Sequence, residues 1–301
     1  MGDANSISSN VEYIFHETEH EKKPENAPRI KTKAVPMPLE KKFLDKVAIV
    51  TEATEGIGFS IAERLAISGA NLVITSSKQE TLDGVVKELT THGVKVFPFF
   101  GNVADAQKRK ALIDFTFQKF QRIDVIVSNA AVNLPTNAVL QTEETTLNKL
   151  WECHFKVHLL LLKAAKVHLQ DRSSIVFVSS VAPEQLWGPR GIYNVTKTVV
   201  IGLTEALAKE LKDLPSNVRV NSIIAGNGQE DNAISKPSEK GNLFEFIPKL
   251  FRTKKYKGTK AAEAIDPSVT IAERTLFLAS DDALNISGQT YVLPGRPTSR
   301  L

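Results

Sequence analysis

Three residues, Ser180, Tyr193 and Lys197, have the types and the spacing needed to protonate a carbonyl group. A free tyrosine has a pKa of about 10, so it exchanges protons near neutral pH only if a fixed positive charge favours the phenolate. Lys197 lies four residues after Tyr193, which places both side chains on one face of a helix. Ser180 could hydrogen-bond the carbonyl oxygen. The set therefore suits general acid catalysis.

Two secondary-structure elements must position these residues. Residues 174–179 form an apolar run typical of a buried strand, so Ser180 should follow its end. The segment 191–212 is expected to be a helix, because an apolar stripe recurs through it at helical spacing, at Val195, Val199, Leu203, Leu207 and Leu211. The same pattern also suits an ordinary amphipathic helix with a packed tyrosine and a solvated lysine. Only the surrounding sequence can separate these interpretations.

The amino-terminal half contains a pattern typical of a nucleotide-binding unit. An apolar run at 47–50 is followed by a turn from Thr51 to Gly58, a helical pattern that ends near Gly69, and a second apolar run at 72–75. The glycines of such a turn let a diphosphate approach the unpaired N–H groups at the helix N-terminus. A bare G-x-G also occurs in ordinary turns, so the prediction depends on the flanking strands and helix.

Further apolar runs, separated by segments long enough for helices, continue along the chain. Strands that alternate with helices form parallel units, and a parallel sheet that is covered on both faces has continuously apolar strands. We therefore expect an α/β fold, a single doubly wound Rossmann-type domain with a seven-stranded parallel sheet. The expected strands are 47–50, 72–75, 94–97, 123–127, 174–179, 218–223 and 290–293.

Over about residues 45–301 the chain resembles the short-chain dehydrogenase/reductase superfamily. It is most similar to a branch of peroxisomal NADPH-dependent carbonyl reductases and retinol dehydrogenases. The resemblance implies that Tyr193 donates the proton, that Ser180 orients the carbonyl, and that Lys197 lowers the tyrosine pKa and holds the nicotinamide ribose. The matching motifs are the turn at 51–58, Asn129-Ala130-Ala131, Ser179-Ser180 and the segment from Tyr193 to Lys197.

The resemblance also implies a relay position and a set of cofactor contacts. His154 falls where the family usually has an asparagine whose backbone helps to hold the water of a proton relay, a role that a histidine backbone could keep. Asn102 falls where the family often has an acid near the adenine, although asparagine is also a common turn residue. The implied cofactor contacts are Thr51, Gly56, Ile57, Gly58, Ser76, Ser77, Lys78, Asn102, Val103, Asn129, Ala130, Tyr193, Lys197 and Gly226.

The end of the second expected strand favours NADP(H) over NAD(H) as the cofactor. NAD-specific enzymes usually place a carboxylate there against the adenosine ribose. Residues 75–78 contain no carboxylate, and Lys78 with the hydroxyls of Ser76 and Ser77 could bind a 2′-phosphate. The related branch often has an arginine in place of Ser77. The alternative is that Lys78 is a solvated loop residue.

Two departures from the family pattern affect the cofactor site. Glu52 occupies the first position of the turn, where the superfamily usually has glycine, close to the expected diphosphate. Like charges about 4 Å apart repel by roughly 4 kcal/mol at an effective dielectric constant of 20. Alternatively, Glu52 points to solvent and pairs with Lys78 or another cation. After the sixth strand, Ala225-Gly226 replaces the Pro-Gly of the family.

Composition argues against several other classes of protein. The net charge is only +4, and the basic residues between 252 and 260 suit a solvated surface better than a nucleic-acid site. The six histidines lack the paired spacing of metal ligands, so no metal is expected. Cys153 is the only cysteine, which excludes an intrachain disulfide. No segment is long and apolar enough to predict a transmembrane helix.

The ends of the chain differ from its centre. Residues 1–42 are polar and are expected to form a flexible tail without a secretory signal, and residues 43–298 form the domain. Within the domain, the segment 227–260 suits either a substrate lid or a surface helix. Residues 299–301, Ser299-Arg300-Leu301, are a close variant of the S-K-L peroxisomal address. We therefore expect a peroxisomal protein that binds the import receptor, with the cytoplasm as the alternative.

Together these features predict an NADPH-dependent oxidoreductase that transfers hydride between the cofactor and a lipophilic ketone, aldehyde or matching alcohol. The resemblance implies retinoid-like or aromatic carbonyl substrates and a homodimer or homotetramer. The alternative is a catalytically impaired family member that serves as an oligomer subunit or binding protein. The intact set of Ser180, Tyr193 and Lys197 favours the enzyme, whereas the replacements are arguments for the alternative: Glu52, His154 and Ala225.

Overall fold

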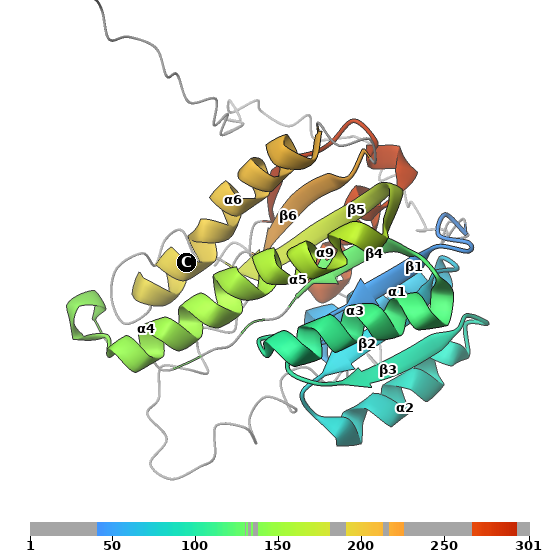
Figure 1. Ribbon diagram of the computed structural model, residues 1–301, viewed down its shortest axis with the longest axis horizontal. Helices are drawn as coiled ribbons and strands as arrows, with labels where there is room; N and C mark the ends of the chain where they lie inside the picture. Colours follow the sequence, from blue (N-terminus) through green and yellow to red (C-terminus); the bar gives the residue numbers. More distant parts are fainter. Residues whose placement is uncertain are drawn as a thin grey trace, which may run out of the picture. The chain divides into compact units, whose positions relative to one another are not determined.

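The computed structural model describes residues 41–129, 131, 134, 138–180, 191–212, 217–225 and 267–293, all of which belong to one compact unit, Leu39–Leu301. Strands and helices alternate along this unit (Figure 1). The strands are β1 (Val47–Val50), β2 (Asn71–Ser76), β3 (Val96–Phe100), β4 (Ile123–Ser128), β5 (Leu169–Ser180), β6 (Arg219–Ala225) and β7 (Thr290–Leu293).

The helices lie between these strands. The α-helices are α1 (Gly56–Ile67), α2 (Gln79–Thr90), α3 (Ala106–Phe120), α4 (Glu144–Trp151), α5 (Val157–Ala165), α6 (Gly191–Lys212) and α9 (Pro267–Ala279). A π-helical turn, η2 (Glu152–Lys156), joins α4 to α5, and short 3₁₀ turns are found at η1 (Val139–Gln141), η3 (Lys166–His168) and η6 (Asp281–Ala283).

All seven strands belong to one parallel sheet in the order β3-β2-β1-β4-β5-β6-β7. The fold is therefore the doubly wound Rossmann-like domain that the sequence predicts. The strand order reverses beside β1, which pairs with β2 on one side and with β4 on the other. In open α/β sheets, ligands bind outside the carboxyl ends of the strands at such a reversal.

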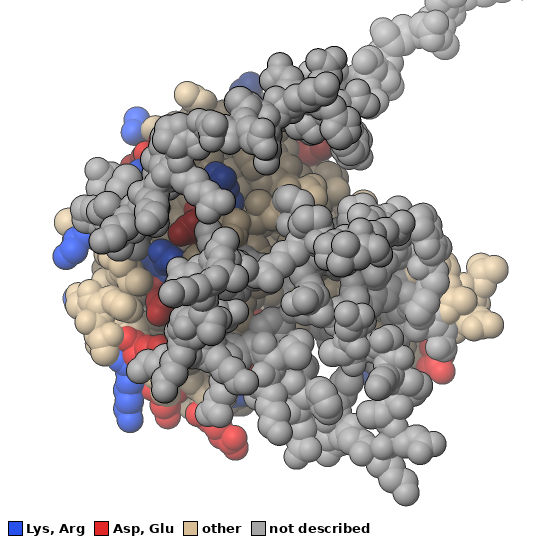
Figure 2. All heavy atoms as spheres, turned by 180° about the vertical axis from the view of Figure 1, so that it is seen from behind, with Lys and Arg blue, Asp and Glu red and all other residues tan. Residues whose placement is uncertain are grey.

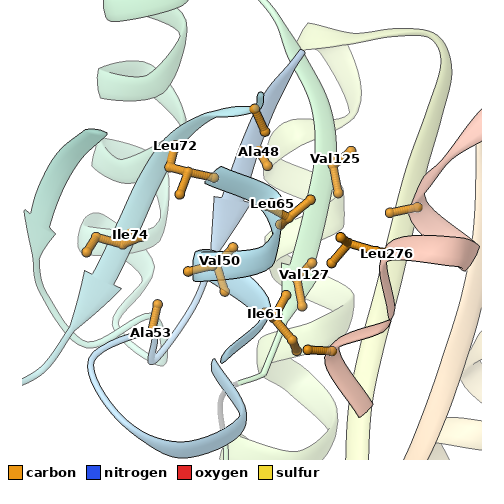
Figure 3. Close-up of a cluster of buried hydrophobic side chains, with 14 of the residues drawn as sticks. Ala48, Val50, Ala53, Ile61, Leu65, Leu72, Ile74, Val125, Val127 and Leu276 are labelled. Carbon is orange, nitrogen blue, oxygen red and sulfur yellow. The ribbon is translucent and has the colours of Figure 1, made fainter. Parts of the chain in front are cut away.

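Each face of the sheet is covered by helices, and successive strand residues enter opposite cores. Val50 packs with Ile61 and Leu65 of α1 in the core shared with α2 and α9 (Figure 3). Its neighbour Ile49 faces the other core, which includes Leu161 of α5 and residues of α3 and α6. Burial of both faces explains why the strands have continuously apolar sequences.

Helix α6 has the predicted bounds, but its buried face is wider and more polar than predicted. Leu203, Leu207 and Leu211 are buried as expected, whereas Val195 is 49 % exposed. Near the start of the helix, the buried positions instead hold Asn194, Thr196 and Lys197. The predicted apolar stripe is therefore wrong in the first turn, where the helix buries polar groups.

Arg219, at the start of β6, links the sheet to the end of α9. Its buried guanidinium donates to the carbonyl oxygens of Leu278 and Ser280, at 2.7 and 2.9 Å. These are carbonyls at and just beyond the C-terminus of a helix, which have no partner within the helix and attract a positive charge. These backbone hydrogen bonds compensate part of the cost of burying this arginine, whose Nε has no hydrogen-bond partner among the described residues.

The surface carries charges of both signs. On the face shown in Figure 2, described lysines and arginines lie among described aspartates and glutamates. Among the described helices, none combines the length and the hydropathy needed to cross a membrane. In the same part of the chain, no group of three or more metal-ligating side chains is found.

Replacing Leu65 by alanine should lower the free energy of unfolding by about 2–5 kcal/mol, because Leu65 is fully buried and its loss leaves a cavity. The matched control is Leu140→Ala in η1, where the side chain is 100 % exposed, and its effect should stay within about 0.5 kcal/mol. Urea denaturation of the full-length variants measures both values. Equal effects of the two substitutions would contradict the described core.

Candidate functional site

The candidate residues gather at the carboxyl edge of the sheet. Thr51 follows β1, Asn129 follows β4, and Ser180 is the last residue of β5. Because the strands are parallel, these three ends lie at one edge. Ser180 is also paired in register with Ala225, the last residue of β6. The sheet thereby brings together residues that are far apart in the sequence.

The turn after β1 is held closed by contacts with the end of β4. The buried hydroxyl of Thr51 accepts the Asn129 backbone N–H at 2.8 Å. The Asn129 amide donates to the Glu52 carbonyl at 3.3 Å. A Cβ atom on Gly58 would lie 2.1 Å from that same carbonyl oxygen and 2.7 Å from the Asn129 amide nitrogen. Only glycine at position 58 therefore allows the turn to fold back onto α1.

The N-terminus of α1 is suited to bind an anion. Its N-cap residue, Glu55, makes no side-chain capping hydrogen bond, and the first turn of the helix contains no acidic residue. A twelve-residue helix in this state presents unpaired N–H groups and the positive end of its dipole. Together with the close approach that Gly58 permits, this arrangement fits the diphosphate of a dinucleotide cofactor.

Glu52 is, with Glu55, one of two acidic residues of this turn that oppose an anion. Its φ of +49° is in the left-handed region, where glycine is favoured and other residues are strained. Burial raises the pKa of the Glu52 carboxyl to about 7, although the charge of Lys78 and a hydrogen bond from the Ser77 backbone lower it in part. The carboxyl of Glu55 acts in the same direction as burial. Near neutral pH, Glu52 is thus divided between its charged and neutral forms.

Lys78 forms its ion pair with Glu55 rather than with Glu52. The distance between the Lys78 ammonium and the Glu55 carboxylate is 3.1 Å, and both side chains are partly exposed. Ser76 is buried, and its hydroxyl accepts the Lys78 backbone N–H at 3.0 Å and contacts the Thr54 hydroxyl at 3.2 Å. The end of β2 and the turn after β1 are therefore joined by hydrogen bonds and by one ion pair.

The two candidate residues after β3 have local structural partners. The Asn102 side chain accepts the Ala104 backbone N–H at 2.9 Å, which is the geometry of an asparagine turn before α3. Asp105 then caps α3 by accepting the N–H groups of Gln107 and Lys108. The Val103 side chain is buried in the core. Asn102 thus has the role of a turn residue, which the sequence left open as an alternative.

Helix α6 places a buried ammonium beside a phenol. The Lys197 ammonium lies 5.8 Å from the centre of the Tyr193 ring. Burial lowers the pKa of Lys197 to about 8, and no carboxylate of the described residues pairs with it. The Ser179 hydroxyl donates to the Lys197 carbonyl at 3.2 Å, which fixes this turn of α6 against β5. The positive charge of Lys197 is therefore available to Tyr193.

His154 contacts two residues of α6, Tyr193 and Thr196. It is fully buried in the π-helical turn, and its ring meets the Tyr193 ring edge-on at a centroid distance of 5.1 Å. Its Nδ1 lies 2.9 Å from the Thr196 hydroxyl, which itself donates to the Tyr193 carbonyl. A hydroxyl has one proton to donate, so Nδ1 of His154 is the donor in this contact.

His158, one turn further along, is a buried residue that the sequence did not single out. Its Nδ1 lies 2.7 Å from the Ser128 hydroxyl at the end of β4, and its Nε2 has no hydrogen-bond partner. Burial and the repulsion of Lys197 lower the pKa of His158 to about 3. The ring therefore stays neutral and does not serve as an acid. The sequence offered one signal for this residue: His158 lies four residues after His154, which is one helical turn.

Cys153 is influenced by charges from two parts of the site, helix α6 and the turn after β1. Its thiol is half-buried, and its pKa is raised by burial and by Glu152. Its ionisation also responds to the charges of Lys197 and Glu52, which lie on α6 and in the turn after β1. Ala130, Gly226 and the segment 227–260 lie outside the described residues.

Comparison with known proteins agrees with this geometry. A family model described as enoyl-(acyl carrier protein) reductase matches residues 52–295. Tropinone reductase-like 3 of Erythroxylum coca is 41 % identical over 266 residues, 87 % of this chain and 96 % of that protein. Dehydrogenase/reductase SDR family member 4 of Rattus norvegicus is 35 % identical over 259 residues, 85 % of this chain and 88 % of that protein.

Solved structures share the fold at lower identity. A short-chain dehydrogenase/reductase of Serratia marcescens superposes with a TM-score of 0.68 at 23 % identity, covering 86 % of this chain and 98 % of that one. A short-chain dehydrogenase of Burkholderia cenocepacia in complex with NADP gives 0.68 at 22 % identity, covering 84 % and 98 %. The family match and the identities with relatives show that this chain belongs to the short-chain dehydrogenase/reductase superfamily.

Proposed function

We propose that the chain is an NADPH-dependent oxidoreductase that acts on lipophilic ketones and aldehydes or on the matching alcohols. The observation that supports this proposal most directly is the Lys197 ammonium, buried without a carboxylate partner among the described residues, beside the Tyr193 ring. Burying an ammonium is unfavourable, so its retention next to a phenol is typical of a functional site. The cofactor supplies the hydride.

The residues of this chain provide the proton and the positioning. The positive charge of Lys197 favours the phenolate form of Tyr193, which allows the phenol to give a proton to a carbonyl oxygen and take it back. Ser180, at the end of β5, donates a hydrogen bond to the same oxygen. On this proposal the backbone of His154, in the π-helical turn, helps to hold the water of the proton relay.

The proposed preference for NADPH rests on the end of β2. No carboxylate is present from Thr75 to Lys78, and the Lys78 ammonium lies beside the N-terminus of α1 through its contact with Glu55. The pair is partly exposed, so exchanging Glu55 for a 2′-phosphate costs little. Residues Ser76 and Ser77 add hydroxyl groups. Retinoid-like and aromatic carbonyls are the proposed substrates, in keeping with the family branch that the sequence resembles.

A second candidate is a catalytically impaired family member that acts as an oligomer subunit or binding protein. The observation that favours it is Glu52, whose partly buried carboxyl lies in the turn that would hold the diphosphate. A homodimer or homotetramer is proposed in either case. The exposed apolar side chains of Leu147 on α4 and Val195 on α6 are compatible with an interface on these helices. The cofactor titrations described below separate the two candidates.

A peroxisomal location, with recognition by the import receptor, is proposed from the sequence Ser299-Arg300-Leu301 alone, because this tripeptide lies outside the described residues.

Substituting Tyr193 by phenylalanine should lower kcat/KM for NADPH-dependent carbonyl reduction by about 10²–10⁴-fold, because it removes the proton donor. Tyr291→Phe removes the same hydroxyl from a partly buried residue of β7 and should leave the rate unchanged. Steady-state assays with a panel of aromatic and retinoid-like carbonyls measure both rates. Retention of full activity in the Tyr193 variant would refute its role as the acid.

NADPH should bind more tightly than NADH, and Lys78→Met should weaken NADPH binding by about tenfold while changing NADH binding by less than about threefold. Calorimetric titration of the purified protein gives the four dissociation constants. Lys87→Met, at an exposed position of α2, is the matched control. An equal loss for both cofactors would mean that Lys78 does not recognise the 2′-phosphate.

A fluorescent protein fused to the N-terminus of this chain should accumulate in peroxisomes, and deletion of Leu301 should release it into the cytoplasm. Microscopy with a peroxisomal marker measures the distribution. An unchanged punctate pattern after deletion would contradict recognition through the tripeptide.

A further inference from the structure

We propose that Glu52 controls cofactor binding through its own protonation: the turn after β1 accepts the cofactor with Glu52 as a neutral carboxylic acid, so binding above neutral pH takes up one proton. This inference rests on the proposed function, because it concerns the same cofactor site. Glu52, which opposes an anion when it is ionised, thereby makes the affinity for the cofactor depend on pH.

The backbone of Glu52 is fixed from two sides, so the residue cannot move away from the site by a shift of the chain. Its carbonyl accepts the Asn129 amide at 3.3 Å, and a Cβ atom on Gly58 would lie 2.1 Å from the same oxygen. The φ of +49° is set by this closed turn. An anion in this turn therefore meets a residue whose backbone stays in place, and protonation of its carboxyl removes the repulsion.

Burial and three nearby groups determine the charge state of Glu52 in the free protein. Lys78, before α2, and the backbone N–H of Ser77 stabilise the ionised form, while Glu55 in the same turn opposes it. Cys153, on the π-helical turn, is the other titratable group coupled to Glu52, and its own raised pKa keeps it a neutral thiol near pH 7. Burial remains the largest influence.

Because Lys78 pairs with Glu55, it compensates the negative charge of an ionised Glu52 only in part. Two carboxyl groups act on one ammonium, and the ammonium lies 3.1 Å from Glu55. Lys78 is the only positive charge that acts on Glu52 among the described residues. A proton is therefore the counter-charge that remains available, which agrees with the raised pKa of Glu52.

Binding of a diphosphate at the N-terminus of α1 would favour the protonated form further. A negative charge nearby raises the pKa of a carboxyl group, and by linkage the ligand then binds more tightly to the protonated protein. A protonated carboxyl also carries an O–H donor, which an ionised one lacks. Below a pH of about 7 the affinity should be constant. Above it, the affinity should fall by up to about tenfold per pH unit.

The test is isothermal titration calorimetry of the full-length protein with NADPH at pH 8, in two buffers that differ in ionisation enthalpy. The difference in heat gives the number of protons taken up. We expect wild-type protein to take up close to one proton per cofactor, and Glu52→Gln to take up much less. The 2′-phosphate, whose pKa is about 6, is already ionised at this pH and does not contribute.

Matched variants and a second cofactor separate Glu52 from other groups. Lys197, with a pKa of about 8, is present in wild type and in the variants, so the difference in proton uptake between them is what is assigned to Glu52. Glu88→Gln, at an exposed position of α2, should behave as wild type. NADH lacks the 2′-phosphate and should show the same uptake. Glu52→Gly serves as a second variant, because it suits the positive φ if glutamine disturbs folding.

The outcomes distinguish this inference from the proposed function. Between pH 6 and pH 8, the dissociation constant of wild type should rise by about tenfold and that of Glu52→Gln by less than about threefold. Tight binding without proton uptake, or uptake that persists in the Gln and Gly variants, would overturn the inference and leave the function intact. Binding by the variants alone, with none by wild type at pH 6, would also overturn it. Failure of every protein to bind either cofactor would refute the proposed function itself.

Discussion

The site depends on the parallel pairing of β1 with both β2 and β4. This pairing, together with that of β4 and β5, places the ends of β1, β2, β4 and β5 at one edge. The buried hydrogen bond between Thr51 and Asn129 joins two of these ends directly. The helices that follow the strands then present their N-termini or side chains to the same region. Without the reversal of strand order beside β1, the cofactor turn and the Tyr193 helix would have no common space.

Two ionisable groups of the site are buried under opposite constraints. Lys197 is an ammonium without a carboxylate partner in the described part of the chain, and Glu52 is a carboxyl that shares one ammonium with Glu55. Burial moves the pKa of Lys197 down and that of Glu52 up, so both approach the neutral range. Buried ionisable groups with shifted pKa values are expected where a protein handles protons or charged ligands.

The sequence predicted the sheet well because strands that are buried on both faces are apolar along their whole length. All seven expected runs correspond to strands, with ends that differ by a few residues, and α6 spans the expected residues. The exposed Val195 was not predicted, because helical spacing alone cannot tell which of two faces meets the sheet. Polar residues near a site can occupy the buried face when hydrogen-bond partners await them, as Thr196 shows.

The interactions that the sequence missed all join distant segments. The contact between His158 and Ser128 spans two elements, and the ion pair between Lys78 and Glu55 is decided by side-chain reach rather than by any local pattern.

Glu52, in the turn after β1, differs from these cases. Its backbone already has the left-handed conformation of a glycine, and a glutamate codon differs from a glycine codon by one base. A single nucleotide change could therefore remove the carboxyl without any rearrangement of the chain, which makes the charge of this turn readily reversible in evolution.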